Sequence, residues 1–164
     1  MDADFLDTEA FMNGDRGRGG YDDMETLLAR LEAYIAPWRN PKTELNRLRC
    51  EILNTCMEAG SKPKGVYTLT VPTGGGKTVA SLAFALRHAA VHGMQRVIYV
   101  IPYTSIIEQN AQVFRDILGE GNVLEHHANI SFDLSDGAPP EEVRRALATE
   151  NWDMPVVVTT AVQL

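Results

Sequence analysis

Apolar residues recur at helical spacing in two stretches of the N-terminal third of the chain. In residues 22–35 and 43–59 they return every three or four positions, which predicts two amphipathic helices. Pro37 and Pro41 interrupt the pattern between them, and Gly60 follows the second stretch as a helix stop. The repeating residues are Met24, Leu27, Leu28, Leu31 and Ile35, then Leu45, Leu48, Ile52, Leu53 and Cys56.

Beyond Pro63 the pattern changes to short β-branched runs that alternate with helical stretches. Such alternation predicts an α/β fold, a parallel sheet with helices on both faces. The runs 97–101 and 156–158 are continuously apolar, which favours strands buried on both sides. The predicted strands are 66–71, 97–101, 122–126 and 155–160, and the predicted helices are 78–92, 104–118 and 140–150.

The segment Pro-Thr-Gly-Gly-Gly-Lys-Thr, residues 72–78, lies between a predicted strand and a predicted helix, where a phosphate-binding loop belongs. Glycines allow backbone amides to converge on a phosphate, and a helix N-terminus adds partial positive charge. Val71 replaces the first glycine of the usual pattern, but the loop core is intact. A chance glycine-rich turn is the disfavoured alternative. The predicted nucleotide-binding residues are Thr73, Gly74, Gly75, Gly76, Lys77 and Thr78, with Lys77 on the phosphates and Thr78 on Mg²⁺.

Hydroxyl side chains follow two other predicted strands. Thr104 and Ser105 open the helix after strand 97–101, where they and the first-turn amides can hold a phosphate. Composition alone favours a plain helix cap at these positions. Thr159 and Thr160 end the last predicted strand at the same ligand edge, although threonine also suits strands without any ligand.

Charge and composition limit the class of protein. The 164 residues carry a net charge of −7, which argues against a generally basic nucleic-acid-coating protein but leaves open a motor that grips a strand in one groove. No apolar run approaches the roughly 18–20 residues that cross a bilayer, and the N-terminus is acidic, so we expect a cytoplasmic protein with no membrane partner. Cys50 and Cys56 are expected to be free, half-buried thiols.

Two further pairs of residues have simple structural interpretations. His88 and His92 stand four apart, as in a zinc pair, but no third ligand is near, and histidines in a last helical turn suit the helix dipole. Trp38 and Trp152 flank predicted linkers and are interpreted as packing anchors in preference to base-stacking platforms.

Taken in order, three segments resemble the first motor lobe of a superfamily-two helicase, a RecA-like P-loop domain. Residues 72–78 resemble motif I, residues 102–109 resemble motif Ia, and residues 158–164 resemble the strand-end threonine motif that contacts the DNA backbone. The resemblance implies that Lys77 and Thr78 hold ATP and Mg²⁺ and that Thr104, Ser105, Thr159 and Thr160 contact single-stranded DNA.

The sequence resembles more closely the CRISPR-associated helicase-nuclease of type I systems, in which an HD nuclease precedes such a motor. Residues 2–9 resemble the end of the HD domain, which implies a vestigial metal ligand at Asp4. Residues 45–49 lie where the pre-motor helix precedes the phosphate loop, and residues 124–127 resemble a segment between motifs Ia and Ic. Residues 1–41 are thus expected to be an HD remnant and linker, and residues 42–164 an incomplete first helicase lobe with an N-terminal helical extension.

The resemblance also implies partners and a limit to activity. The parent enzyme acts on single-stranded DNA after recruitment by an RNA-guided surveillance complex, and only the full-length parent carries the divalent metal of the HD domain. The motif II Asp-Glu pair and the second motor lobe are missing, so we expect an internal fragment that is inactive alone. The alternatives are a non-catalytic remnant and a P-loop small-molecule kinase.

Overall fold

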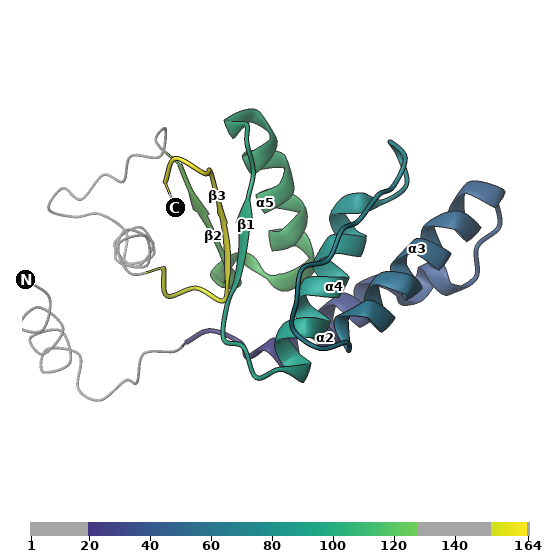
Figure 1. The fold of residues 1–164 in the computed structure, drawn as a ribbon, viewed down its shortest axis with the longest axis horizontal. Coiled ribbons are helices and arrows are strands. Elements are labelled where there is room, and N and C mark those ends of the chain that lie inside the picture. The colour runs from purple at the N-terminus through teal and green to yellow at the C-terminus, as the bar shows by residue number, and fades with distance from the viewer. Residues whose placement is uncertain (1–19, 128–151, 164) are drawn as a thin grey trace, which may run out of the picture.

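A computed structural model describes residues 20–127 and 152–163, which form a parallel sheet with helices packed beside it (Figure 1). The α/β fold class is therefore confirmed. The helix predicted at 140–150 and the residues around Asp4 lie outside the described part. The elements are α2 (Met24–Ile35), η1 (Ala36–Arg39), α3 (Glu44–Gly60), α4 (Lys77–Val91), β1 (Val97–Val100), α5 (Thr104–Leu118), η2 (Glu120–Asn122), β2 (Val123–His126) and β3 (Val156–Thr159).

The sheet has three strands in the order β1-β3-β2, and both pairings are parallel. β3 comes last in the sequence and lies in the centre. The register aligns Val100 and His126 with Thr159 on either side of it. Because the strands are parallel, their carboxyl ends lie at one edge of the sheet. The sequence predicted this common edge for the hydroxyl residues that follow the strands.

One hydrophobic core lies between the sheet and the helices α2, α4 and α5. Alternate strand residues, including Val123, Val156 and Val158, point into it. The opposite face carries a small cluster in which Leu124 and Val157 pack with Tyr21 and Trp152. Helices were predicted on both faces, but the helices of the described residues cover only one. The largest fully buried helix side chains are Phe114, Leu27, Leu31, Leu82, Leu86, Ile107 and Leu118.

The strand predicted at residues 66–71 does not form. Residues 66–70 have no regular secondary structure and are exposed, and Val66 is 98% exposed. β-branched composition favours an extended backbone, but a strand also needs a partner for its amides and carbonyls. In the described part of the chain β1 pairs only with β3, so this segment has no ladder to join.

The prediction that residues 97–101 are buried on both sides is also wrong. β1 lies at an edge of the sheet, and its side chains alternate between half-buried and exposed. Ile98 and Val100, each more than two-fifths exposed, point away from the helical core. The same prediction of burial on both sides is correct for β3, whose four residues are all buried.

Close packing joins α3 to α4 and thereby positions the phosphate loop between them. A Cβ on Gly60 would lie 2.8 Å from Arg87 Cβ and 2.9 Å from the Phe84 carbonyl oxygen, so the end of α3 rests directly on α4. The imidazoles of His88 and His92 pair with the carbonyls of Gly60 and Lys62 at 3.0 and 2.8 Å. These histidines hold the turn after α3 through their contacts with its carbonyls.

Candidate nucleotide-binding site

The glycines of the loop at residues 72–76 meet two different steric requirements. Gly74 and Gly76 have φ of +81° and +79°, in the left-handed region that glycine adopts without strain. Gly75 is buried, and a Cβ there would lie 2.5 Å from Val71 Cγ1. The turn is closed by the Gly75 amide, which donates to the Pro72 carbonyl at 3.0 Å. Glycine is therefore required at Gly74 and Gly76 by the backbone conformation and at Gly75 by close packing against Val71.

The loop leads directly into the N-terminus of α4. Gly76 is its N-cap residue, and the first helical hydrogen bond runs from the Ala80 amide to the Gly76 carbonyl at 3.1 Å. The amides before Ala80 have no partner within the helix and are available to an anion. Lys77 and Thr73 are exposed beside them, and Thr78 is half-buried in the first turn. All six predicted nucleotide-binding residues are therefore brought together.

Arg49 on α3 reaches across to this loop. Its Nε donates to the Gly74 carbonyl at 2.9 Å, and its Nη1 donates to the Asn46 Oδ1 at 3.4 Å. The aliphatic stem also lies against Gly76, where a Cβ would be 3.7 Å from Arg49 Cγ. Sequence reasoning assigned Arg49 no role. The available signal was its position four residues before Leu53, which places it on the side of α3 that faces α4.

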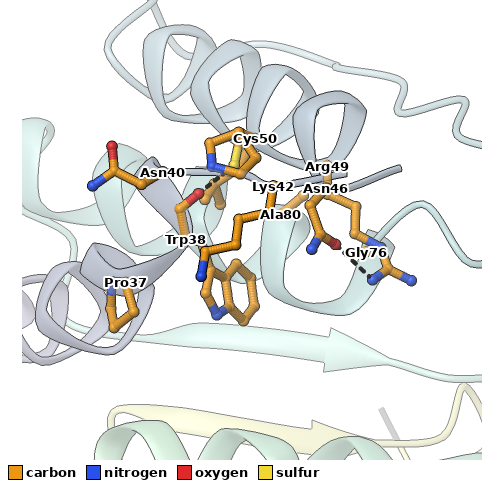
Figure 2. A pocket seen from close by; sticks show the side chains of 11 residues that line it. Pro37, Trp38, Asn40, Lys42, Asn46, Arg49, Cys50, Gly76 and Ala80 are labelled. Atoms are coloured by element: carbon orange, nitrogen blue, oxygen red, sulfur yellow. Dashed lines mark hydrogen bonds between the residues drawn. The ribbon is translucent and has the colours of Figure 1, made fainter. Parts of the chain in front are cut away.

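A cavity of about 490 Å³ opens beside the loop, between η1, the following linker and α3 (Figure 2). Its volume is in the range of small-molecule sites. The Cys50 thiol on α3 donates to the Trp38 carbonyl and so connects η1 to α3. Gly76 and Ala80 belong to the cavity wall, so the phosphate loop and the cavity are continuous. The other lining residues are Pro37, Trp38, Asn40, Pro41, Lys42, Asn46, Arg49, Cys50 and Leu53.

The chemistry of the cavity suits an anionic ligand with a flat polar end. Lys42 and Arg49 are its charged residues and both are cationic, although the chain as a whole has net charge −7. The Trp38 ring supplies an aromatic surface, and two carboxamides, Asn40 and Asn46, supply donors and acceptors. Trp38 packs edge-on against Tyr34, as a packing anchor does, but it also forms cavity wall.

The residues present fit a nucleoside triphosphate with Mg²⁺. Unpaired amides at a helix start and the exposed ammonium of Lys77 are a donor set for phosphate oxygens. The Thr78 hydroxyl is of the kind that ligates Mg²⁺ at such loops. In the described residues no acidic side chain lines the cavity to oppose the charge of the phosphates.

The strand-end residues lie at the carboxyl edge of the sheet. Thr159 is fully buried, and its Oγ1 lies 3.3 Å from His126 Nδ1. Thr160 is also buried. α5 begins at Thr104 with Tyr103 as its N-cap, so Thr104 and Ser105 lie in the first turn and do not occupy the cap position. A role for these four residues in binding DNA stays a prediction.

A buried ionic cluster lies at the carboxyl end of β2. Glu125 accepts from Arg115 Nη2 at 3.0 Å and from His127 Nε2 at 2.9 Å. Glu108 approaches the same group closely enough that the three could surround a cation. The Arg115 guanidinium already neutralises Glu125, however, so the cluster is an internal ion pair that ties α5 to β2.

These features define a class of protein. A glycine loop closing on a helix N-terminus, next to a parallel sheet and beside a cationic cavity, is the site of a P-loop nucleoside triphosphatase. The sequence matches the DEAD/DEAH box helicase family over residues 51–164, more than two thirds of the chain, and the protein belongs to that family. Proteins of this family generally use ATP with Mg²⁺, so the site is that of a helicase-type ATP-binding domain. No curated protein matches the sequence.

The family match begins within α3 and includes all six loop residues. It does not include α2, although α2 packs in the same core as α4 and α5. The division of the chain at residue 41 stays a prediction, as does the metal ligand at Asp4, which lies outside the described residues. Within the described part, no helix is long and apolar enough to span a membrane.

Proposed function

We propose that this chain is the nucleotide-binding part of the first motor lobe of a single-stranded DNA helicase, in a CRISPR-associated helicase-nuclease of type I systems. Family membership supports the helicase, and it favours this function over a small-molecule kinase. The residues that support the more specific function are the HD-like segment 2–9, the pre-motor segment 45–49 and the segment 124–127. The partners proposed for the whole enzyme are single-stranded DNA and an RNA-guided surveillance complex.

The observation that carries the proposal is the loop from Gly74 to Lys77 at the start of α4. The loop amides and Lys77 bind and orient phosphate oxygens, and Thr78 supplies a hydroxyl to Mg²⁺. ATP supplies a phosphoanhydride whose hydrolysis drives movement along the strand. The cavity beside the loop excludes water from one side of the bound nucleotide and supplies cationic and carboxamide groups to it.

DNA contact is proposed at the carboxyl edge of the sheet, where strand-end hydroxyls and the first amides of α5 lie. Uncharged donors of this kind bind phosphate without reading base sequence. Thr159 is buried against His126, whereas Tyr103, the N-cap residue of α5, is exposed. A translocating motor needs such sequence-independent contacts.

The 164 residues alone are proposed to bind nucleotide with little or no turnover. The 164 residues contain no Asp-Glu pair to complete the Mg²⁺ site and orient water. DNA-stimulated ATP hydrolysis by this chain alone would contradict that statement.

Thermal unfolding with increasing Mg-ATP tests the proposal. At ligand a hundredfold above Kd, binding adds about 2.7 kcal/mol of stability, which raises the midpoint clearly. We expect Lys77→Ala to remove the shift, because the ammonium that offsets phosphate charge is lost. Lys64→Ala is the matched control, because Lys64 is an exposed lysine that lies before the loop in the sequence and outside it.

Two outcomes oppose the proposal in different ways. If neither variant nor wild type responds to Mg-ATP, although each unfolds cooperatively, the chain is a non-catalytic remnant. If wild type responds but a fluorescent single-stranded oligonucleotide shows no change in anisotropy with or without nucleotide, the ATP site stands and DNA contact by this lobe fails.

A further inference from the structure

Charge is distributed unevenly along the chain. Residues 59–107 contain no aspartate or glutamate, although the whole sequence has 22. This stretch has a net charge of +5, from Lys62, Lys64, Lys77, Arg87 and Arg96. The other 10 of the 15 lysines and arginines stand against all 22 acidic residues, which gives the rest of the chain a net charge of −12. A polyanion is therefore attracted to the surface that residues 59–107 form and repelled by most of the remainder.

Three of these cations, Lys62, Lys64 and Arg87, form a basic surface at the end of α4 that is farthest from the phosphate loop. α4 starts at Lys77, and Arg87 is ten residues further on, a rise of about 15 Å along the helix. In Figure 1 the turn that follows α3 lies beside the last turns of α4, away from the phosphate loop. This turn carries Lys62 and Lys64, and both are exposed. The basic surface is thus separate from the nucleotide site.

Side-chain contacts hold the turn after α3 against α4. Arg87 Nε donates to Ser61 Oγ at 3.1 Å. The imidazoles of His88 and His92 bond to the backbone carbonyls on either side of Ser61, at 3.0 and 2.8 Å. These contacts fix the backbone at Lys62 next to the last turns of α4. The three cations therefore share one surface because the fold holds them there.

In the described part of the chain, no carboxylate lies within ion-pair distance of the basic surface. The described arginines that do form ion pairs with carboxylates, Arg30 and Arg115, lie elsewhere. Glu58 is the acidic residue that most closely precedes the turn in the sequence. It stands two positions before Gly60, whose Cβ position faces α4, and that spacing of about 200° places Glu58 on the other side of α3. The three charges are therefore directed to solvent without a neutralising neighbour.

An aromatic ring borders the basic surface. Tyr67 is 39% exposed, and its hydroxyl donates to the carbonyl of Pro63 in the same turn. Its ring packs against Phe84 at 5.1 Å between centroids and edge-on against His88 at 6.0 Å, so it is held in place with part of its surface open. Cations beside an exposed ring bind single-stranded nucleic acid, because phosphates meet the charges and a base stacks on the ring. An acidic peptide has the charges but no base.

We propose that the basic surface, together with the Tyr67 ring, is a second contact for single-stranded nucleic acid, separate from the contact at the strand ends. α4 leads from the phosphate loop back to the turn before β1, so the basic surface lies at the amino edge of the sheet. A strand bound there occupies a different side of the lobe from one bound at the carboxyl edge. The contact holds the strand through its phosphates and needs no nucleotide.

The measured quantity is the affinity of the full chain for a fluorescent single-stranded thymidine oligonucleotide, from anisotropy titrations at several salt concentrations without nucleotide. For single strands, log K falls against log salt with a slope of about −0.7 per phosphate contact, so Lys62→Ala combined with Lys64→Ala should make the slope shallower by about 1.4. Tyr67→Leu should weaken binding about tenfold at every salt concentration and leave the slope unchanged, because base stacking releases no counterions.

A second double variant separates a local contact from a general effect of charge. Arg39→Ala combined with Arg47→Ala removes two exposed cations that lie outside the turn and outside α4. Both double variants lower the net charge by two, but only the lysine pair belongs to the basic surface. The arginine pair should therefore leave the affinity and the salt slope near those of wild type. Each variant is first checked for an unfolding midpoint near that of wild type.

An unchanged slope in the lysine variant would overturn the proposal, as would equal effects of the two double variants, since binding would then follow net charge alone. Wild type that binds no oligonucleotide overturns it as well. If poly-glutamate of equal charge displaced the oligonucleotide equally well and Tyr67→Leu had no effect, the basic surface would be a site for acidic protein segments. Failure of the strand-end contact looks different: the lysine variant would lose all binding, and the basic surface would stand as the contact of this lobe.

Discussion

Two β-branched segments of similar composition have opposite environments in this molecule. Residues 66–70 lead into the phosphate loop and are exposed and unpaired, whereas β3 leads to the strand-end threonines and is buried throughout. β3 lies between β1 and β2 and contacts helices on one face. In the described structure residues 66–70 have no neighbouring strand on either side.

The difference shows that the burial of a segment depends separately on its apolar pattern and on its position in the sheet. Valine and threonine favour an extended backbone in both segments, but only pairing on both sides satisfies the polar groups of the peptide and allows burial. It also shows that the loop at residues 72–76 is not held by a strand before it. The loop is held from behind by α4 and from the side by Arg49.

The largest expected difference between the two segments is in amide hydrogen exchange. Amides of β3 lie in a ladder at the centre of the sheet and should open only with global unfolding, whereas those of residues 66–70 have no ladder partner. A global stability of even 5 kcal/mol makes the protection of β3 roughly a thousandfold or more greater. Exchange followed by mass spectrometry measures it. Similar protection in both segments would mean that residues 66–70 form a ladder in solution.

A matched pair of truncations gives the next largest effect. Val158→Ala removes two methyl groups from a fully buried site, and we expect unfolding free energy to fall by about 2–3 kcal/mol. Val66→Ala makes the same change at a residue that is 98% exposed, so the loss should stay within about 0.5 kcal/mol. Urea denaturation of both variants tests the comparison. A large loss from Val66→Ala would show a buried environment for that residue.

The smallest effect is the pH dependence of stability that comes from His126, at the end of β2 beside Thr159 of β3. Burial, together with the neighbouring His127, holds the pKa of His126 below its ordinary value. The unfolded chain then binds a proton more readily than the folded chain, so stability should fall as pH drops below about 6.5. His126→Asn keeps a polar partner for the Thr159 hydroxyl and should reduce this slope. Unfolding midpoints between pH 5 and 8 measure it, and parallel profiles for the two proteins would contradict the prediction.

Much of the fold could be predicted from the sequence because its helices carry strong local signals. α2, α3, α4 and α5 begin and end within two residues of the predicted limits. Asp23 and Thr43 cap α2 and α3 as their residue types suggest, through bonds to Thr26 and Asn46. The strands were less predictable, since pairing depends on residues far away in sequence. The segment before the loop and the exposed face of β1 are the two failures of this kind.

The candidate site also has a part that the sequence predicts, the loop, and a part that it does not, the cavity. The loop residues are contiguous, so one local pattern predicts all six, and their part in nucleotide binding stays a prediction. The cavity forms where a linker, a helix and the loop meet in space. Arg49, one of its lining residues, lies 25 positions before Gly74 in the sequence. Helical spacing places Arg49 on the same side of α3 as Leu53, but the sequence does not show that the loop lies against that side. Nor does any pattern show that the hydroxyl of Thr159 is taken by a histidine from another strand.

The placement of the two tryptophans has a spectroscopic consequence. The chain has only two, and they lie at different functional regions: Trp38 in the wall of the cavity, and Trp152 with its ring edge against His126, 5.5 Å between centroids. Indole emission depends on what lies against the ring. Trp152→Phe therefore leaves a single indole that reports on the cavity, and Trp38→Phe leaves one that reports on the strand ends. The protein carries its own pair of optical probes, one for each region of the motor.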